Sequence, residues 1–351
     1  MDVIAIFDVG KSSKRLLLFD YGLNIVHQEE KLFAEIHDSA GVGCDDTEAI
    51  ITWMKSRLSG VIRTGDYTVR GLNFTGARSC LIHLDEEGNW IGSEEDKKVR
   101  DTAIHETFGI NIEGHEIRAG YGVRNTSASM IPYLMSTEKP FILVSTGAWC
   151  TFMNPFNADI TAADGITDET ISLVKIEGLQ VKTSRALLGE IHDLNVARLD
   201  DRFGVTGELF KTIKIKSKKI KKMLAGRHGR IFFRHGIPEG YVDNDANLSH
   251  FLTYADAYHQ MVFDLADLCM ESYRAVLSSA DNTEIVYVTG GFARNDTFVR
   301  VLAARMPDKR VFASTVENAT ALGAAITVYE SAFGTKLPPV YLGLKAIIDN
   351  D

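Results

Sequence analysis

The sequence contains few cysteines and prolines and lacks any long apolar run. Only 4 of its 351 residues are cysteine and 7 are proline, which excludes a disulfide-stapled mini-protein and a collagen. No stretch reaches the roughly 18 consecutive apolar residues that a membrane span needs. The cysteines are far apart and have no zinc-binding spacing, so we expect reduced thiols in a cytoplasmic protein.

The chain also lacks an excess of basic residues. Lys and Arg total 38 against 47 Asp and Glu, a net charge of −9, so we expect neither nucleic acid nor an anionic membrane as a partner. The segment 211–222 (KTIKIKSKKIKK) is a local exception. It predicts a solvated helix face, with binding of an acidic partner as the alternative. The N-terminus MDVIAIFDVG has no basic region and predicts a first strand rather than a signal peptide.

Apolar periodicity predicts a mixed α/β chain. Runs at 3–9, 15–20 and 24–33, separated by short turns, predict an antiparallel meander. Helices are expected at 47–58, 96–108, 125–135, 183–196, 247–280 and 317–333. Further strands are expected at 69–76, 80–90, 171–176, 178–182 and 310–314. The segment 141–153 predicts two strands joined by a small-residue turn, and 284–306 predicts a strand, a glycine turn and a helix.

A strand–turn–strand pattern occurs twice, at 3–20 and at 141–153. The two copies match in pattern and not in residue identity. They predict two related α/β domains facing a cleft, with an N-terminal domain at 1–118 and a C-terminal domain at 119–351.

The turn of the first copy is rich in small and basic residues between Asp8 and Arg15. Backbone amides in such a turn can bind phosphate oxygens, and its hydroxyls and cations can add charge-assisted hydrogen bonds. An aspartate at a strand end can hold Mg²⁺ through water. Taken alone, the turn is equally compatible with a plain β-turn that exposes basic residues.

Two further turns follow apolar strands. One spans Ser145 to Ala148, and the other is Thr289-Gly290-Gly291-Phe292, followed by Asn295. A double glycine lets the backbone approach a flat ligand closely, although close helix–strand packing is the alternative. Three such turns in this order are more specific than any one of them.

The order of these motifs resembles that of the FGGY carbohydrate kinases, and the motif sequences are most similar to those of rhamnulokinase-like members. The resemblance rests on the segments DVGKSSKR (8–15), GVRNTSAS (122–129), VSTGAWC (144–150), VTGGFARND (288–296) and ENATALGAA (317–325). It implies the two-domain α/β fold of the actin-like ATPases and sugar kinases. It also implies ATP and Mg²⁺ as cofactors and a small sugar or polyol as the acceptor.

The resemblance also implies roles for individual residues. The first phosphate loop would comprise Asp8, Gly10, Lys11, Ser12, Ser13 and Arg15, with Asp8 on the metal side. The second phosphate loop would comprise Ser145, Thr146, Gly147 and Ala148. Gly290, Gly291 and Asn295 would line the adenosine pocket, and Arg78 and Ser79 would contact the sugar.

Three departures from the family pattern concern activity. Asn125 stands where the family has its catalytic aspartate, and an amide cannot act as the general base. Ala148 replaces the usual threonine, and the chain is short around 92–105, where the family places much of its sugar-binding lobe. Two functions therefore stay open: an ATP-dependent carbohydrate kinase, and a nucleotide-binding pseudokinase or weak ATPase. The sequence indicates no oligomeric state.

Overall fold

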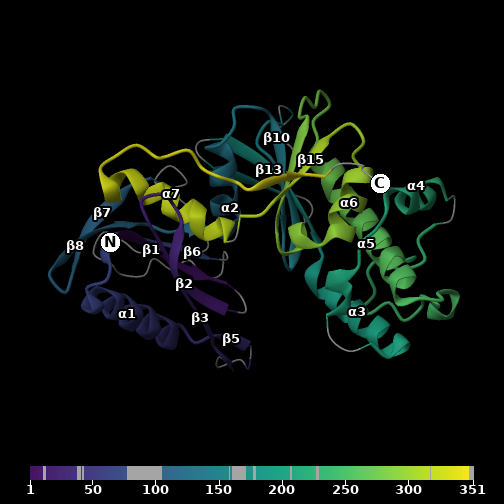
Figure 1. Ribbon diagram of the computed structural model, residues 1–351, viewed down its shortest axis with the longest axis horizontal. Coiled ribbons are helices and arrows are strands. Elements are labelled where there is room, and N and C mark those ends of the chain that lie inside the picture. The colour runs from purple at the N-terminus through teal and green to yellow at the C-terminus, as the bar shows by residue number, and fades with distance from the viewer. Residues whose placement is uncertain are drawn as a thin grey trace. The chain divides into compact units, whose positions relative to one another are not determined.

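The computed structural model describes most of the chain (Figure 1). The described residues are 1–10, 13–37, 41, 43–76, 105–157, 159, 171–176, 179–205, 208–226, 229–316 and 318–347. They form two compact units. Unit 1 comprises Met1–Thr137, Lys175–Gly178 and Asn318–Tyr341, and unit 2 comprises Glu138–Val174, Leu179–Glu317 and Leu342–Asp351. The first change of unit lies at residue 137, beyond the expected boundary at 118, and residues 115–134 contact the strand at 68–76.

Unit 1 is built on a seven-stranded sheet with the order β3-β2-β1-β6-β8-β7, in which β9 also pairs with β6. Its strands are β1 (Asp2–Val9), β2 (Ser13–Phe19), β3 (Ile25–Leu32), β6 (Thr68–Gly76), β7 (Thr107–Ile112), β8 (His115–Gly120) and β9 (Val123–Arg124). A small separate sheet pairs β4 (Glu35–His37) with β5 (Gly43–Asp45). The predicted antiparallel meander β1–β2–β3 is confirmed. On its other side, β1 pairs with β6 in parallel.

Helices cover both faces of the unit 1 sheet (Figure 1). They are α1 (Thr47–Thr64), α2 (Asn125–Leu134) and α7 (Ala319–Phe333). Alternate strand residues such as Phe7 and Leu16 pack with Trp53 of α1, since successive strand side chains point to opposite faces. On the other face, α7 contacts β1, β6 and β8 and packs closely against α2.

The contact between α7 and α2 depends on a glycine. A Cβ added at Gly323 would lie 1.8 Å from the carbonyl oxygen of Ala128, so only glycine allows this approach. The buried amide of Asn73 then joins β6 to α7: its Nδ2 donates to the Ala324 oxygen at 3.1 Å and to Thr327 Oγ1 at 2.8 Å. Its Oδ1 accepts from the N–H of Gly122 at 3.0 Å, which fixes the turn before β9.

Unit 2 contains a second seven-stranded sheet with the order β12-β13-β11-β10-β14-β15-β16. Its strands are β10 (Phe141–Thr146), β11 (Trp149–Asn154), β12 (Ile171–Ile176), β13 (Leu179–Leu187), β14 (Ile285–Gly290), β15 (Arg310–Ser314) and β16 (Leu344–Ala346). Its helices are α3 (Gly189–Phe203), η4 (Leu209–Thr212), α4 (Ser217–Ala225), η5 (Leu248–His250), α5 (Tyr254–Val276), η6 (Gly291–Arg294) and α6 (Asp296–Ala304). Residues of α5 and α6 such as Met261, Leu265 and Phe298 form its core with Phe152 of β11.

The helix expected at 47–58 continues to Thr64, and three other expected helices differ in extent or type from those observed. The helix expected at 183–196 begins only at Gly189, because residues up to Leu187 continue strand β13 and pair with β11. Thr107 and Phe108, expected at the end of a helix, belong to β7 and pair with β8. The stretch 247–280 is divided into η5 and α5, where the side chain of Thr253 caps α5 by accepting from the N–H of Asp256. The strand expected at 80–90 and the rest of 96–108 lie outside the described residues, apart from 105 and 106.

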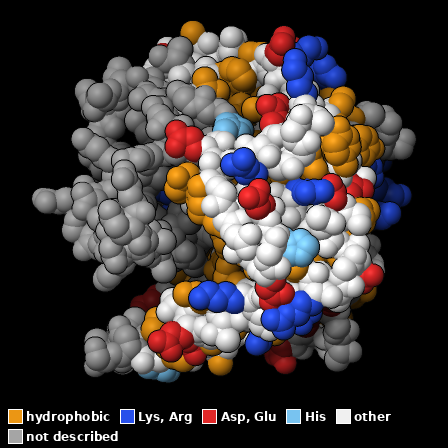
Figure 2. Space-filling view, turned by 90° about the vertical axis from the view of Figure 1, so that its left-hand side faces the viewer, with side chains coloured by type: hydrophobic (Ala, Val, Ile, Leu, Met, Phe, Trp, Pro, Cys, Tyr) orange, Lys and Arg blue, Asp and Glu red, His pale blue; other side chains and the backbone are white. Residues whose placement is uncertain are grey.

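Charged side chains of both signs are interspersed over the face shown in Figure 2, with hydrophobic side chains between them. The basic segment 211–222 includes the first six residues of α4, and most of its lysine side chains are exposed, as expected for a solvated helix face. Within the described ranges, no helix is both long and apolar enough to cross a membrane.

Asp264 of α5 generates a prediction about pH and stability. Burial raises its pKa to about 6, although its carboxylate accepts from the N–H groups of Ile231 and Phe232. Between about pH 4 and 6 the folded state keeps a proton that the unfolded state has lost, so stability should fall as pH rises, by up to about 3 kcal/mol. Asp264→Asn should reduce this decline in urea denaturation across that window. Equal declines in both proteins would contradict the assignment.

Candidate functional site

In unit 1, the carboxyl ends of three parallel strands meet at one edge of the sheet. The pairing of β1, β6 and β9 places Asp8 beside Thr75, and Thr75 beside Val123, while Arg15 of β2 lies opposite Asp8. Side chains at this edge of an α/β sheet are well placed for ligands. The structure therefore brings the first predicted phosphate loop and Asn125, which directly follows β9, to the same edge.

The carboxylate of Asp8 is buried, with 4% of the residue exposed. Burial raises its pKa, and the guanidinium of Arg15 partly offsets this effect. Its Oδ2 accepts hydrogen bonds from Arg15 Nη2 and from Thr320 Oγ1, the latter at 3.4 Å. Because both bonds use Oδ2, Oδ1 is the oxygen that can take a ligand.

The side chain of Arg15 connects the first loop to the start of α7. Its Nη1 donates to Oδ1 of Asn318, a residue with a φ of 57° immediately before the helix. The loop itself turns tightly, since the N–H of Gly10 donates to the Ser13 oxygen at 3.1 Å. Neither Asn318 nor Thr320 was expected at the site, because their partners are some 300 residues away in the sequence. Four other expected residues lie outside the described residues: Lys11, Ser12, Arg78 and Ser79.

Asn125 is the exposed first residue of α2. Its Oδ1 accepts a hydrogen bond from the Thr126 hydroxyl at 3.3 Å. The first turn of α2 contains no acidic residue that could take over the role of a base. The site therefore has an amide where the resemblance implies a carboxylate.

In unit 2, the second turn joins β10 to β11 and is tied to the start of α3. The N–H of Gly147 donates to the Trp149 oxygen at 2.9 Å, and the carbonyl of Ala148 accepts from the N–H groups of Leu188 and Gly189, each at 3.0 Å. Gly147 is exposed, and a Cβ added there would meet no described atom within 4 Å. The turn is thus rigid on its α3 side and open at Gly147.

The two glycines of the third turn have different surroundings. Gly290 has a φ of 87°, and a Cβ on it would lie 1.9 Å from the carbonyl oxygen of Thr146. Gly291 is exposed, and its own added Cβ would have no neighbour within 4 Å among the described residues. Gly290 is therefore needed for packing between β14 and β10, whereas Gly291 is accessible to a ligand.

Thr146 joins the second turn to the third. Its buried hydroxyl donates to the Thr289 oxygen at 2.5 Å and accepts from the N–H of Phe292 at 3.1 Å. Ser145, its neighbour on β10, is half-buried. The Thr146 side chain is thus occupied by the protein itself, so its contribution to a ligand would come from the backbone.

Asn295 also has protein partners, which include two residues that the sequence did not indicate. Its Oδ1 accepts from the N–H of Phe298 at 3.1 Å and caps α6, while its Nδ2 donates to the hydroxyl of Tyr258 at 2.7 Å. That hydroxyl lies 3.1 Å from Nε2 of buried His192, whose Nδ1 lies 2.8 Å from Asp193 Oδ1. In this series of hydrogen bonds, every donor faces an acceptor if His192 carries its proton on Nδ1.

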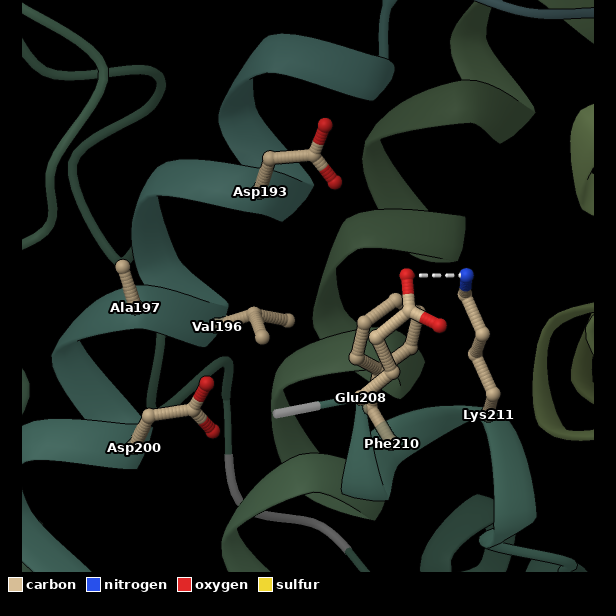
Figure 3. A pocket seen from close by; sticks show the side chains of 7 residues that line it. All are labelled: Asp193, Val196, Ala197, Asp200, Glu208, Phe210 and Lys211. Carbon is tan, nitrogen blue, oxygen red and sulfur yellow. Dashed lines mark hydrogen bonds and ion pairs between the residues drawn. The ribbon is translucent and has the colours of Figure 1, made fainter. Parts of the chain in front are cut away.

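A cavity of about 420 Å³ lies next to this series of hydrogen bonds and shares Asp193 with it. Figure 3 shows Asp193, Val196, Ala197 and Asp200 on α3, with Glu208, Phe210 and Lys211 across from them. Glu208 and Lys211 form an ion pair. Three carboxylates against one ammonium disfavour a phosphate group here, so the cavity does not suit the charged part of a nucleotide.

The contrast between Gly290 and Gly291 predicts opposite effects of substitution. Gly290→Ala forces a side chain into a glycine-only conformation and into the Thr146 carbonyl, so it should lower the free energy of unfolding by about 3 kcal/mol or more. Gly291→Val should leave it within about 1 kcal/mol of wild type, since nothing in the protein is displaced. Urea denaturation measures both, and equal losses would contradict the geometry.

Comparisons with known proteins give one family-model match and a set of similar folds. Residues 264–336 match the family model of the carbohydrate kinase FGGY C-terminal domain. A comparison with curated protein sequences found no match.

Solved kinase structures resemble the whole chain. A carbohydrate kinase from Novosphingobium aromaticivorans is 15% identical, with a TM-score of 0.64 over 92% of this chain and 93% of that one. A ligand-bound xylulose kinase from Lactobacillus acidophilus is 11% identical, with a TM-score of 0.65 over 99% and 93%. A Plasmodium falciparum glycerol kinase with ADP is 11% identical, with a TM-score of 0.64 over 93% and 89%. Residues 264–336 thus match the C-terminal domain of the FGGY carbohydrate kinases, and the chain has the two-domain actin-like fold of these solved sugar kinases.

Proposed function

We propose that the protein binds MgATP and transfers its γ-phosphoryl group slowly to a hydroxyl of a small sugar or polyol. The FGGY match of residues 264–336 supports a kinase origin. The observation that carries the proposal is the open surroundings of Gly291, next to a Gly290 that is closely packed. In this proposal Gly291 approaches the adenosine, and Gly147 offers its backbone to the phosphates.

The residues at the unit 1 edge fit a magnesium ion. Mg²⁺ is usually held by one or two carboxylates together with substrate phosphates and water. Asp8 supplies one buried carboxylate, and the bonds from Arg15 and Thr320 both go to its Oδ2, so the proposal assigns Oδ1 to the ion. When bound, the ion would neutralise charge on the phosphates. Arg15, held by Asp8 and Asn318, places a cation at the same edge.

Asn125 is the reason to expect slow transfer. An amide can orient a sugar hydroxyl but cannot accept its proton at neutral pH. Phosphoryl transfer depends mainly on positioning and electrostatics, so activity need not vanish without a base. General base help is worth roughly 10²–10⁴-fold, which sets the size of the expected deficit.

The same residue supports a second candidate function. A pseudokinase that binds nucleotide as a sensor or partner protein, or a weak ATPase, would keep the edge around Asp8 and need no base at Asn125. Sugar-dependent release of ADP separates the two candidates, because only the kinase requires an acceptor.

The proposed function predicts nucleotide binding. Millimolar MgATP or MgADP should raise the melting temperature of the wild type, because a ligand at 100 times its Kd stabilises the folded state by about 2.7 kcal/mol. Gly291→Val should retain the melting temperature of the free protein and lose the shift. Thermal scans with and without nucleotide measure both, and no shift in the wild type would count against both candidates.

A further prediction of the proposed function concerns Asn125. The variant Asn125→Asp restores a carboxylate that is ionised at pH 7 unless burial raises its pKa strongly. Since Asn125 is exposed, we expect turnover with a sugar or polyol to rise roughly 10²–10⁴-fold. A coupled assay of ADP release with a panel of ketoses and polyols measures this.

The matched control is Asn125→Ala, which should not gain turnover. Fast phosphorylation by the wild type would show that Asn125 is not a lost base. No gain in Asn125→Asp, with nucleotide binding intact, would favour the pseudokinase.

A further inference from the structure

Basic side chains are concentrated in one segment of this acidic chain. Residues 209–238 contain ten lysines and arginines and no aspartate or glutamate, although the whole chain has a net charge of −9. The lysines of 211–222 lie on and just before helix α4, which packs on α6 at the periphery of unit 2 (Figure 1). A surface with both signs interspersed would keep the protein soluble equally well, so this separation of charge needs another explanation.

The backbone that carries these lysines is fixed against the rest of unit 2. Ile215 and Ile220 are buried in the core of the unit. Nε2 of His259 on α5 lies 3.1 Å from the carbonyl oxygen of Lys214 and holds the segment that leads into α4. The lysines are therefore presented by a folded scaffold, so a partner that binds them orders little additional backbone.

Two lysines of the segment are neutralised by the protein itself. The ammonium group of Lys219 donates to Asp256 and to Nδ1 of His259, the latter at 2.8 Å. Lys211 forms its ion pair with Glu208. These two lysines connect the segment to its neighbours and do not need an external partner.

Four other lysines form an exposed basic face: Lys214, Lys216, Lys218 and Lys222. Their ammonium groups have no hydrogen-bond or ion-pair partner among the residues that the structure describes. Lys218 and Lys222 are four positions apart on α4, on the side opposite buried Ile220. Like charges at this spacing destabilise a helix, so the fold keeps a repulsion that an external anion would relieve.

The surroundings of the basic face favour an acidic protein segment over a membrane or a nucleic acid. Because Ile220 is buried, α4 does not have a complete apolar face to lay into a bilayer, although Leu224 at its end is 41% exposed. The phenylalanines of 209–238 are buried or half-buried, so they offer no exposed ring on which bases could stack. A short acidic segment also avoids the repulsion that a long polyanion would meet from the acidic remainder of the chain.

We propose that the basic face is a docking surface for an acidic segment of a partner protein. Aspartate and glutamate side chains of that segment would accept hydrogen bonds from the four ammonium groups. The acidic remainder of the chain would repel the same segment and so steer it to this face. The inference does not depend on nucleotide binding and goes beyond the proposed function.

The experiment measures the fluorescence anisotropy of a labelled glutamate-rich peptide titrated with the full-length protein at low ionic strength. The triple variant Lys214→Gln/Lys218→Gln/Lys222→Gln should weaken the Kd roughly tenfold or more, because three exposed ion pairs are lost. Added salt should weaken binding to the wild type, since exposed charges are screened.

The matched control is Lys55→Gln/Lys336→Gln/Lys345→Gln, which makes the same change in net charge at exposed lysines outside the basic face. It should bind the peptide nearly as tightly as the wild type. An equal loss of affinity in both triple variants would show that net charge alone governs binding, and the proposal would be wrong.

Stability gives a second readout that separates docking from folding. The triple variant at Lys214, Lys218 and Lys222 should melt at the wild-type temperature or slightly above it, because only repulsion is removed. Lys219→Gln should lower the melting temperature, since it loses Asp256 and His259, and should retain most of the affinity for the peptide.

Two further outcomes would overturn the proposal. One is a wild type that does not bind the peptide at low ionic strength. The other is tighter binding to vesicles of phosphatidylcholine and phosphatidylserine, or to a single-stranded oligonucleotide, than to the peptide, which would make a membrane or a nucleic acid the partner. Neither outcome bears on nucleotide binding, so the proposed function is tested separately.

Discussion

Parallel pairing of a hairpin strand with a central strand organises the described candidate loops of each unit. In unit 1, β1 pairs with β6, and in unit 2, β10 pairs with β14. Because the strands are parallel, the loop after the hairpin strand and the Thr-Gly end of its partner emerge at the same edge. Asp8, Thr75 and Asn125 meet in this way in unit 1, as the second and third turns do in unit 2.

Two glycines allow the backbone to come close enough for this arrangement. Gly323 brings α7 onto the Ala128 carbonyl of α2, which places Asn318 and Thr320 beside Arg15 and Asp8. Gly290 brings β14 onto the Thr146 carbonyl, and Gly291 then faces open space. At both positions any side chain would prevent this close packing, because its Cβ would lie within 2 Å of a backbone oxygen.

The proposed function depends on groups in each unit. In unit 2, Gly147 and Gly291 are exposed, whereas the side chains of Thr146 and Asn295 are bonded to protein partners. In unit 1, Asn125 stands at the position where the proposed kinase would need a base, and an amide does not accept a proton at neutral pH. The balance between these two halves distinguishes a slow kinase from a pseudokinase.

Much of the fold could be predicted from the sequence, because it depends on local periodicity. The meander at 3–33, the hairpin at 141–153 and the strand–turn–helix after residue 284 follow from alternating apolar residues and glycine turns, and the structure confirms them. The same reasoning misplaced the start of α3, since residues 183–187 are held in a strand by β11, which no local pattern reveals. Other features depend on atoms that are distant in the sequence. They are the different surroundings of Gly290 and Gly291 and the hydrogen-bond partners of Asp8 and Asn295. The sequence by itself therefore determined the order of the elements and the small-residue turns, which are local properties. Only the tertiary structure decided which side chains the protein already occupies and which it leaves for a ligand, because that depends on contacts formed when the chain folds.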